Sequence, residues 1–188
     1  MKYLICNINK YNGIDFKNFV NEINVVKRDR LCKMNDEAYK QSIIGEILLA
    51  KLLKEENIDY RNIIVNYNEN GKPYISNYPI YYNISHHKDY VICAINNGPI
   101  GVDILRMDDI DKNKAKTFCT EDEYNYIKNK KQFYQIFTLK EAYLKLFGKK
   151  INDIKNLNII YENKIKLNVI NKSFTNNNYM ISICYIIK

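Results

Sequence analysis

Residues of a type that binds phosphate occur at two turns in the first half of this chain. Ser85, His86 and His87 follow one another at the end of an apolar segment, "NISHH". A hydroxyl, an imidazole and exposed backbone N–H groups together can hold a phosphate, whereas adjacent histidine side chains diverge and rarely bind one metal. Lys72 in "GKP" lies on a glycine-supported turn and can also meet a phosphate. A polar turn without a ligand explains either segment equally well.

An aspartate interrupts an apolar run shortly afterwards. Asp103 stands between Val102 and Ile104 in "GPIGVDIL". Because side chains alternate between the two faces of a strand, we expect Ile100, Val102 and Ile104 on one face and Asp103 on the other. If that second face is open to solvent, Asp103 is an ordinary surface residue.

A glutamate and a lysine share a helical spacing in "FTLKEAYLKLFGK". Glu141 and Lys145 are four residues apart, so they lie on the same face of the predicted helix. A surface ion pair worth about 0.3–0.5 kcal/mol explains this spacing. Phe137, Leu144 and Phe147 in the same segment indicate that part of the helix is buried.

The elements that must position these residues follow from the hydrophobic pattern. Apolar residues recur with helical spacing in three segments, and Asn35 or Asp36 and Gly148 are suitable caps. Strands occur mostly in hairpin-like runs, which indicates an α+β fold. We predict helices at 36–56, 120–129 and 131–147, a turn at 68–75, and strands at 2–8, 62–67, 81–85, 90–96, 98–105, 156–161, 164–170 and 178–187.

Length and charge set the outer limits of the interpretation. A chain of 188 residues with 46% hydrophobic residues fits one globular domain or two small lobes that share a core. Its net charge is +8, and residues 128–150 hold seven lysines against one acid, Glu141. A basic surface suits nucleic acid, a phosphorylated cofactor or an acidic protein, although a solvated lysine face explains it too.

The five cysteines are odd in number and scattered, so they indicate neither a zinc site nor a disulfide framework. Cys6, Cys93 and Cys184 lie in apolar runs and are expected to be buried. The first ten residues have too short an apolar core for a signal peptide, and no apolar run approaches the ~20 residues of a membrane span. We expect a soluble, cytoplasmic protein that does not enter a membrane.

The order of these segments resembles that of the 4′-phosphopantetheinyl transferases of the Sfp type. The resemblance runs from Gly71 to Lys149, somewhat under half of the chain, and all its segments occur in order. It rests on "GKP" at 71–73, "NISH" at 83–86, "PIGVDI" at 99–104, "FCTEDEY" at 118–124 and "FTLKEAYLKLFGK" at 137–149.

The resemblance implies both a fold and a reaction. The family fold has two similar α/β lobes related by pseudo-twofold symmetry, with the active site between them, which places the lobes here at 1–98 and 99–188. The family moves the 4′-phosphopantetheine arm of coenzyme A onto a serine of an acyl or peptidyl carrier protein and releases adenosine 3′,5′-bisphosphate. Such enzymes usually act as monomers, and the Sfp type favours carriers of secondary metabolism. Their carriers are generally acidic, which agrees with the basic charge here.

The resemblance also implies a metal site. Asp103 and Glu141 match the family's metal ligands, and Mg²⁺, with Mn²⁺ as the alternative, prefers carboxylate, phosphate and water oxygens. Glu141, directly or through a water, is the candidate base for the carrier serine. Lys145 is expected to contact the pyrophosphate and stabilise the leaving group.

Further residues correspond to the family's coenzyme A contacts. Lys72 is expected beside the nucleotide, Ser85 on the pyrophosphate and His86 on the 3′-phosphate. In "KRDRLCK", residues 27–33, Lys27 and Arg30 match the basic residues near the 3′-phosphate. Ser42 corresponds to a family threonine only if one residue is deleted, and Glu123 matches a family acid near the metal or has a structural role. The coenzyme A contacts that the resemblance implies are thus Lys27, Arg30, Lys72, Ser85, His86 and Lys145.

Two positions depart from the family pattern. The family's third acid is Leu105 here, and leucine cannot ligate a metal, so metal affinity or choice is open; nothing in the spacing requires Asp108 or Asp109 to substitute. Phe137 replaces the usual tryptophan. Leu105 motivates one rival interpretation, an inactive member that binds coenzyme A or a carrier without transfer. The pI of about 9.1 motivates the other, a basic nucleic-acid-binding protein, although no such motif is present.

Overall fold

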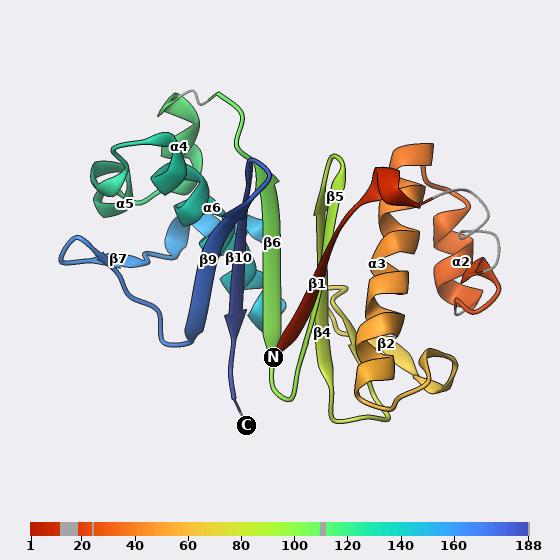
Figure 1. The fold of residues 1–188 in the computed structure, drawn as a ribbon. Coiled ribbons are helices and arrows are strands. Elements are labelled where there is room, and N and C mark those ends of the chain that lie inside the picture. The colour runs from red at the N-terminus through yellow and green to blue at the C-terminus, as the bar shows by residue number, and fades with distance from the viewer. Residues whose placement is uncertain (12–18, 24, 110–111, 188) are drawn as a thin grey trace.

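Two three-stranded antiparallel sheets form the centre of the computed structural model, which describes residues 1–11, 19–23, 25–109 and 112–187 without the side chains of 25, 26, 30 and 112. The first sheet has the strand order β1-β5-β4. A long helix, α3, packs on this sheet (Figure 1). The bounds of these elements are Lys2–Asn7 for β1, Asp36–Glu55 for α3, Tyr81–His87 for β4 and Tyr90–Asn96 for β5.

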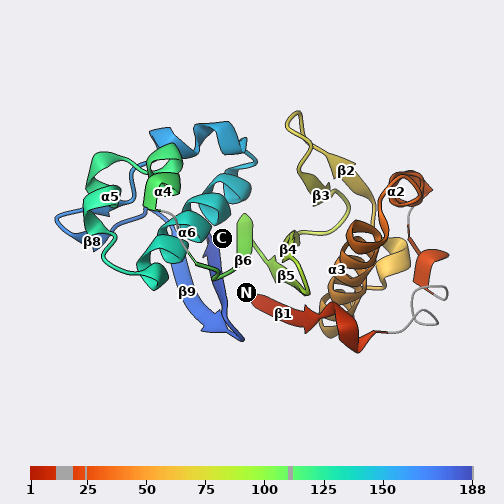
Figure 2. The same cartoon turned by 90° about the horizontal axis from the view of Figure 1, so that it is seen from above.

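The second sheet has the order β6-β10-β9 and is covered by a second long helix, α6. Figures 1 and 2 show this half beside the first, with α4 (Lys112–Phe118) and α5 (Glu121–Tyr126) beyond α6. The chain reaches β6 directly from β5 and returns to the sheet after α6. The bounds are Ile100–Arg106 for β6, Lys130–Phe147 for α6, Ile170–Asn176 for β9 and Tyr179–Tyr185 for β10.

The strands and helices of the two halves follow one another in the same order along the chain. Each begins with an edge strand, continues through a long helix, and ends in an antiparallel hairpin whose last strand takes the central position of the sheet. The predicted α+β class is therefore confirmed, because every strand pair is antiparallel. None of the helices within the described ranges is long and apolar enough to span a membrane.

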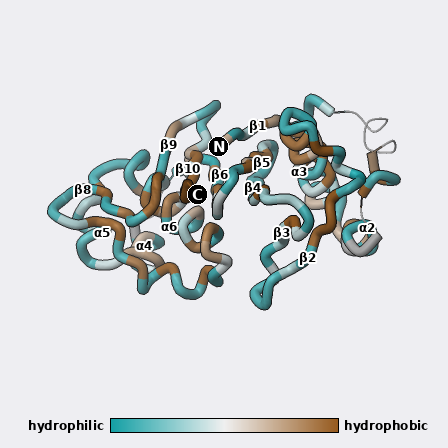
Figure 3. The backbone as a smooth tube through the Cα atoms, turned by 90° about the horizontal axis from the view of Figure 1, so that it is seen from below, coloured by the Kyte–Doolittle hydropathy of each residue, from teal (hydrophilic) through white to brown (hydrophobic). Residues whose placement is uncertain are grey.

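The apolar face of β6 lies between the two sheets. Ile100, Val102 and Ile104 are buried there with residues of β5 and β10, and none of the three is more than 1% exposed. Asp103 lies on the opposite face, as alternation along the strand predicts. Hydrophobic stretches along α3 and β10 mark the neighbouring cores (Figure 3).

The ends of the two long helices show why the sequence predicted them well. The side chain of Asn35 accepts a hydrogen bond from the backbone N–H of Ala38 at the start of α3. Gly148 ends α6 with a φ of +65°, a left-handed conformation that glycine adopts at little cost. Both caps are local, so the residues themselves are sufficient to locate them.

Shorter elements were predicted less well. The helix at 112–118 and the strand at 170–176 were missed, because both are polar and lack a clear period. The predicted strand at 164–170 was wrong over residues 166–169, and the predicted strand at 156–161 begins outside a strand. The remaining elements are α2 Val25–Leu31, β2 Val65–Tyr67, β3 Pro73–Ile75, α4 Lys112–Phe118, α5 Glu121–Tyr126, β7 Ile160–Tyr161, β8 Lys164–Ile165, and three short 3₁₀ turns at Ile8–Lys10, Tyr60–Asn62 and Ile151–Asn156.

Candidate active site

Three predicted site residues from three elements meet in one hydrogen-bonded cluster. Asp103 Oδ1 on β6 accepts a hydrogen bond from Lys145 Nζ on α6 at 2.6 Å and another from Ser85 Oγ on β4 at 2.9 Å. Lys145 Nζ also lies 3.0 Å from Ser85 Oγ. Since β4 belongs to the first half of the chain and β6 and α6 to the second, the cluster joins the two halves.

Glu141 completes the cluster from one turn earlier on α6. Its side chain is buried, and its Oε1 has no hydrogen-bond partner. Burial and the nearby Asp103 carboxylate raise the pKa of Glu141 to about 7, against the opposing effect of Lys145. A buried carboxylate oxygen without a partner is costly, so this position is suited to a ligand that the protein alone does not supply.

The close approach of α6 to β6 depends on Gly101. A Cβ atom at this position would lie 2.0 Å from the Ala142 carbonyl oxygen and 2.4 Å from the Leu146 backbone nitrogen. Gly101 is two residues before Asp103 and therefore faces α6 as well. The absence of a side chain here lets the helix lie directly on the strand that carries Asp103.

Side chains of β4 bond to the free edge of β6. Asn83 Oδ1 accepts from the Val102 backbone N–H at 2.8 Å, and His87 Nδ1 accepts from the Arg106 N–H at 3.2 Å. Ser85 lies between Asn83 and His87 on the same face of β4. These side chains therefore fix β4 against β6 in place of a backbone ladder, a role that the sequence did not indicate for His87.

His86 lies beside the cluster and not within it. Its side chain is exposed, and alternation along β4 directs it to the other face from Ser85. Neighbouring protein atoms still remove part of the water around the ring, and this partial burial, together with the positive charge of Lys145, lowers the pKa of His86 from its usual value. The exposed imidazole remains available to an anion.

The ammonium group of Lys72 donates two hydrogen bonds to backbone carbonyl groups. Its Nζ donates to the carbonyl oxygens of Ile100 at 3.0 Å and Leu146 at 2.9 Å, so it ties the β2–β3 hairpin to β6 and α6. Burial lowers the pKa of Lys72 to about 8. An ammonium group has three donors, which leaves one for a ligand.

The basic segment 27–33 lies apart from the cluster, within the first half of the chain. Lys27 Nζ is 2.6 Å from Glu46 Oε1, and Tyr60 donates to the other oxygen of Glu46 at 2.6 Å. Lys27 and Ser42 line a cavity of about 170 Å³ with Leu31, Met34, Glu46 and Tyr67. The side chain of Arg30 lies outside the described residues.

Glu123 is a structural residue and does not reach Asp103 or Glu141 in any contact of the structure's described part. Its two carboxylate oxygens accept from the backbone N–H groups of Thr120 and Ile159, and Lys140 Nζ lies 2.6 Å from Oε2. Lys140 also donates to the Phe118 carbonyl at 2.7 Å, and both charged side chains are fully buried. Of the predicted "KE" pair, Lys140 thus anchors the helix while Glu141 faces Asp103.

The position of the family's third acid is part of the apolar core. Leu105 is partly buried and packs against the core beneath α6. Asp108 pairs with Arg106 at 2.6 Å and Lys88 at 3.1 Å, and these bonds lower the pKa of Asp108. Asp109 is exposed, 3.8 Å from Lys130. Neither aspartate is placed as a substitute for the missing acid.

The two carboxylates fit a hard divalent cation, because one already has a buried oxygen without a partner. No group of three or more His, Cys, Asp or Glu side chains suited to a metal occurs among the described residues. A cation held here would therefore take two protein carboxylates, Asp103 and Glu141, and complete its shell with other oxygens. Asp103 would exchange its bond to Lys145 for such a cation.

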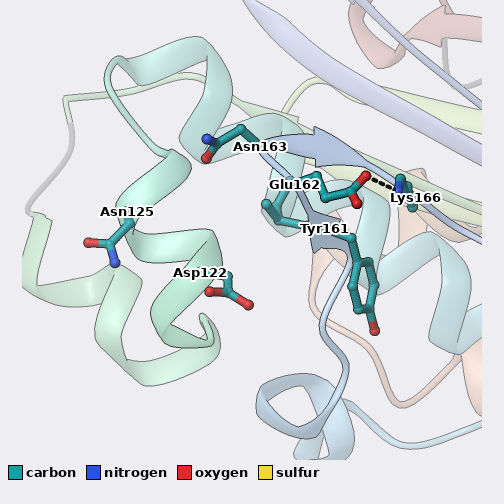
Figure 4. Close-up of a pocket in the computed structure, with 7 residues that line it drawn as sticks. Asp122, Asn125, Tyr161, Glu162, Asn163 and Lys166 are labelled. Carbon is teal, nitrogen blue, oxygen red and sulfur yellow. Dashed lines mark hydrogen bonds and ion pairs between the residues drawn. The ribbon is translucent and has the colours of Figure 1, made fainter.

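Several hollows on the described part of the surface lie away from this cluster. One of about 550 Å³ lies between α5 and the β7–β8 hairpin (Figure 4). Glu162 and Lys166 in its wall are paired at 2.6 Å, and none of the predicted site residues lines it. An unpaired buried carboxylate is a better indication of chemistry than the size of an open hollow, because it carries an energetic cost.

Comparisons with known proteins agree with the predicted family. A family model described as the 4′-phosphopantetheinyl transferase superfamily matches residues 99–187, and one described as 4′-phosphopantetheinyl transferase, N-terminal, matches residues 14–97. Between them, the two models account for most of the chain.

Three curated relatives carry the same description. The chain is 41% identical over 120 residues to the 4′-phosphopantetheinyl transferase gsp of Aneurinibacillus migulanus, which covers 60% of the chain and 50% of the relative. It is 31% identical over 121 residues to psf-1 of Bacillus pumilus (60% and 52%) and 31% identical over 140 residues to Sfp of Bacillus subtilis strain 168 (70% and 62%). The matches thus span only about half to three fifths of the relatives' length.

Proposed function

The chain belongs to the 4′-phosphopantetheinyl transferase superfamily, and on that premise we propose that it transfers the 4′-phosphopantetheine arm of coenzyme A to a serine of an acyl or peptidyl carrier protein. The observation that carries the proposal is the cluster of Asp103, Lys145 and Ser85 beside the unpartnered, buried Glu141. Carboxylates, a lysine and a hydroxyl in one place are the groups that a pyrophosphate substrate with a divalent cation requires.

Each residue has a stated part in the proposed reaction. The carrier serine oxygen forms a bond to the phosphorus next to the pantetheine arm, the bond to the bridging oxygen breaks, and adenosine 3′,5′-bisphosphate leaves. Glu141 accepts the serine proton, directly or through water. Lys145 and Ser85 bond the pyrophosphate, and Lys145 stabilises the charge on the leaving oxygen.

Mg²⁺ or Mn²⁺ held by Asp103 and Glu141 would supply charge neutralisation at the pyrophosphate. Leu105 leaves this site with two protein carboxylates, and Mg²⁺ is commonly bound by one or two carboxylates together with phosphates and water. The absence of a third acid therefore agrees with activity.

The nucleotide contacts are proposed with the geometry in view. His86 is exposed and feels the positive charge of Lys145, which suits the 3′-phosphate, and Lys72 has one N–H left for the nucleotide. Lys27 is paired with Glu46, so a phosphate there would compete with that carboxylate. Arg30 is proposed from the family pattern alone.

We further propose that the halves 1–98 and 99–188 are two lobes related by pseudo-twofold symmetry, with the active site between them. The identical order of elements in the two halves supports this, as does a cluster built from both. Because one chain supplies both lobes, a monomer suffices. The scattered, unpaired cysteines favour the cytoplasm as its compartment.

A mass measurement tests the proposed activity. The protein is incubated with coenzyme A, Mg²⁺ and apo carriers from fatty acid, polyketide and nonribosomal peptide synthesis, and each carrier is weighed. We expect a gain of one phosphopantetheine on at least one carrier, with none on a carrier whose acceptor serine is replaced by alanine. Glu141→Ala protein purified in the same way controls for a contaminating transferase.

Because Leu105 replaces the family's third acid, there is one rival proposal: the chain is an inactive member that binds coenzyme A or a carrier without transfer. The inactive member would be favoured if calorimetry showed that coenzyme A binds while none of the carriers gained mass. A steeply salt-dependent shift of duplex or single-stranded nucleic acid would instead favour the nucleic-acid reading.

A further inference from the structure

A chain of three hydroxyl groups, two buried and one half-buried, connects α6 to the sheet below it. Thr138 Oγ1 on α6 lies 2.7 Å from Ser182 Oγ on β10, which in turn lies 2.9 Å from Ser173 Oγ on β9. Thr138 and Ser182 are both fully buried. Polar groups in such a position persist when every one of them has a partner.

The direction of the chain follows from the number of protons. Thr138 donates its hydroxyl proton to the Tyr134 carbonyl oxygen at 2.8 Å. Thr138 must therefore accept from Ser182, and Ser182 must accept from Ser173, because each hydroxyl has one proton. Ser182 thus donates to Thr138, and if the threonine hydroxyl is removed Ser182 keeps only Ser173 as a partner and no longer bonds to α6.

This hydroxyl pair lies next to the carboxylate pair on both elements. Thr138 is three residues before Glu141, which places the two side chains on neighbouring parts of one helical face. Ser182 is the direct cross-strand partner of Asp103, so their side chains stand on the same face of the sheet. Helix and sheet therefore meet at two adjacent places, the hydroxyl bond between Thr138 and Ser182 and the ion pair between Lys145 and Asp103, and Glu141 lies on the helix between Thr138 and Lys145.

A second restraint lies on the other side of the carboxylates. Gly101, two residues before Asp103, leaves no space for a Cβ against Ala142 and Leu146 of α6. Apolar contacts allow a helix to slide or rotate slightly on a sheet, whereas a 2.7 Å hydrogen bond does not. The contact at Gly101 sets how near the helix lies, and the hydroxyl bond sets its rotation and height.

We propose that Thr138 and Ser182 are positioning residues that hold Glu141 opposite Asp103 in the geometry a divalent cation requires. The inference rests on the proposed function, because it concerns the same site. Ligands of a site must be held within about 0.5 Å of the productive geometry. A residue that orients metal ligands typically changes metal affinity or activity by about 10–100-fold.

Metal binding without turnover tests this proposal. Mn²⁺ is titrated into the 188-residue chain with coenzyme A and no carrier, and free Mn²⁺ is measured by electron paramagnetic resonance. We expect Thr138→Val and Ser182→Ala to weaken Mn²⁺ binding by about tenfold or more. Thr138→Ser keeps the hydroxyl and should bind within about twofold of wild type. In the transfer assay, Thr138→Val should lower kcat and raise the Mg²⁺ needed, with the KM for the carrier unchanged.

Two control variants separate positioning from general stability. Ser173→Ala removes the far end of the same hydroxyl chain and leaves the Thr138–Ser182 bond in place. Ile183→Val lies on the same strand as Ser182, fully buried on its opposite face. We expect both to bind Mn²⁺ as wild type does at a temperature where all variants are folded.

The possible outcomes are distinguishable. Folded Thr138→Val and Ser182→Ala proteins with wild-type Mn²⁺ affinity would overturn the positioning role and leave the proposed function intact. An equal loss of affinity in Ile183→Val would overturn it too, because reduced stability would then be a sufficient cause. Wild-type protein that binds no Mn²⁺ with coenzyme A would contradict the metal site itself, and this inference with it.

Discussion

The ammonium group of Lys145 lies 2.6 Å from Asp103 Oδ1 across the contact between α6 and β6. The lysine therefore holds the aspartate in place before any ligand arrives, while Glu141 stays without a partner at Oε1. An ion pair beside an unpaired carboxylate is an arrangement that suits ligand exchange, because the ligand's own charges can replace those of the pair.

Removal of either carboxylate should abolish transfer. Asp103→Ala and Glu141→Ala each delete one of the two protein oxygen donors at the proposed metal site, so we expect the rate of carrier modification to fall by at least about a thousandfold without unfolding. Glu141→Gln should also stabilise the ligand-free protein at pH 8, because its pKa of about 7 means that ionised Glu141 is disfavoured in the fold.

The sign of this effect gives a second measurement. The folded pKa of Glu141 lies above its ordinary value of 4.5, so its contribution to stability is present below pH 4.5 and is lost as pH rises through 7. In urea denaturation, the free energy of unfolding of Glu141→Gln should rise relative to that of wild type between pH 5 and 8, by roughly 2 kcal/mol.

A near-normal transfer rate in Asp103→Ala or Glu141→Ala would show that the replaced residue is not part of the site.

Leu105→Glu should restore a third carboxylate next to Asp103. Leu105 shares the α6-facing side of β6, so the new side chain would add negative charge there. We expect the Leu105→Glu protein to reach half-maximal transfer at a lower Mg²⁺ concentration than wild type. We also expect it to be about 1–3 kcal/mol less stable without metal, because Leu105 packs on the core. Leu105→Gln is the matched control for the lost packing. Identical Mg²⁺ dependence in the two variants would show that this position has no access to the metal.

Gly101→Ala should be far more harmful than Gly45→Ala. At Gly101 the added Cβ meets backbone atoms of α6 at 2.0 and 2.4 Å, which cannot move without the helix. At Gly45 the nearest atom is the Cγ2 methyl group of Ile84 at 2.8 Å, a side-chain atom that can shift by a few tenths of an ångström without moving either backbone, and alanine offsets that cost as the better helix former by about 1 kcal/mol. We expect Gly45→Ala within about 1 kcal/mol of wild type in urea denaturation and Gly101→Ala to lose at least about 3 kcal/mol. Similar losses in both variants would contradict the close contact at Gly101.

The buried pair of Lys140 and Glu123 should be coupled in stability. Lys140→Met leaves the Glu123 charge buried with only backbone donors, so we expect a loss of about 3–5 kcal/mol. The double variant Lys140→Met/Glu123→Gln should lose less than the sum of the two single changes, as a double-mutant cycle of urea denaturation would show. Additive losses would mean that the 2.6 Å ion pair contributes no coupling.

Lys72 should make stability depend on pH in the alkaline range. Its folded pKa of about 8 lies below the ordinary 10.5, so the unfolded chain binds more protons at this site between those values. The free energy of unfolding of wild type should therefore rise relative to Lys72→Met from pH 8 to 10.5, by about 2 kcal/mol. Neutral Lys72 keeps two N–H donors for the Ile100 and Leu146 carbonyls. Parallel pH profiles of the two proteins would refute the lowered pKa.

The periodicity of the sequence was sufficient to predict on which face of its strand or helix each main site residue lies. Alternation along residues 100–104 placed Asp103 opposite the apolar face, and helical spacing placed Glu141 and Lys145 on one side of α6. The helix caps at Asn35 and Gly148 were predicted in the same way. Hydrophobic periodicity and helix caps depend only on residues that are close in the sequence, so a single sequence is sufficient to predict them.

Partners across long distances in the chain were decided by the tertiary structure alone. Glu123 joins Lys140 inside the core, Lys27 joins Glu46, and Lys72 joins two carbonyls, although each residue type would also suit a ligand. A charged side chain takes whichever partner the packing of distant elements brings within about 3 Å, and no spacing along the chain records that distance. The sequence by itself therefore determined the faces of the strand and helix and the family, while the contact of α6 with β6 decided which of the candidate groups meet.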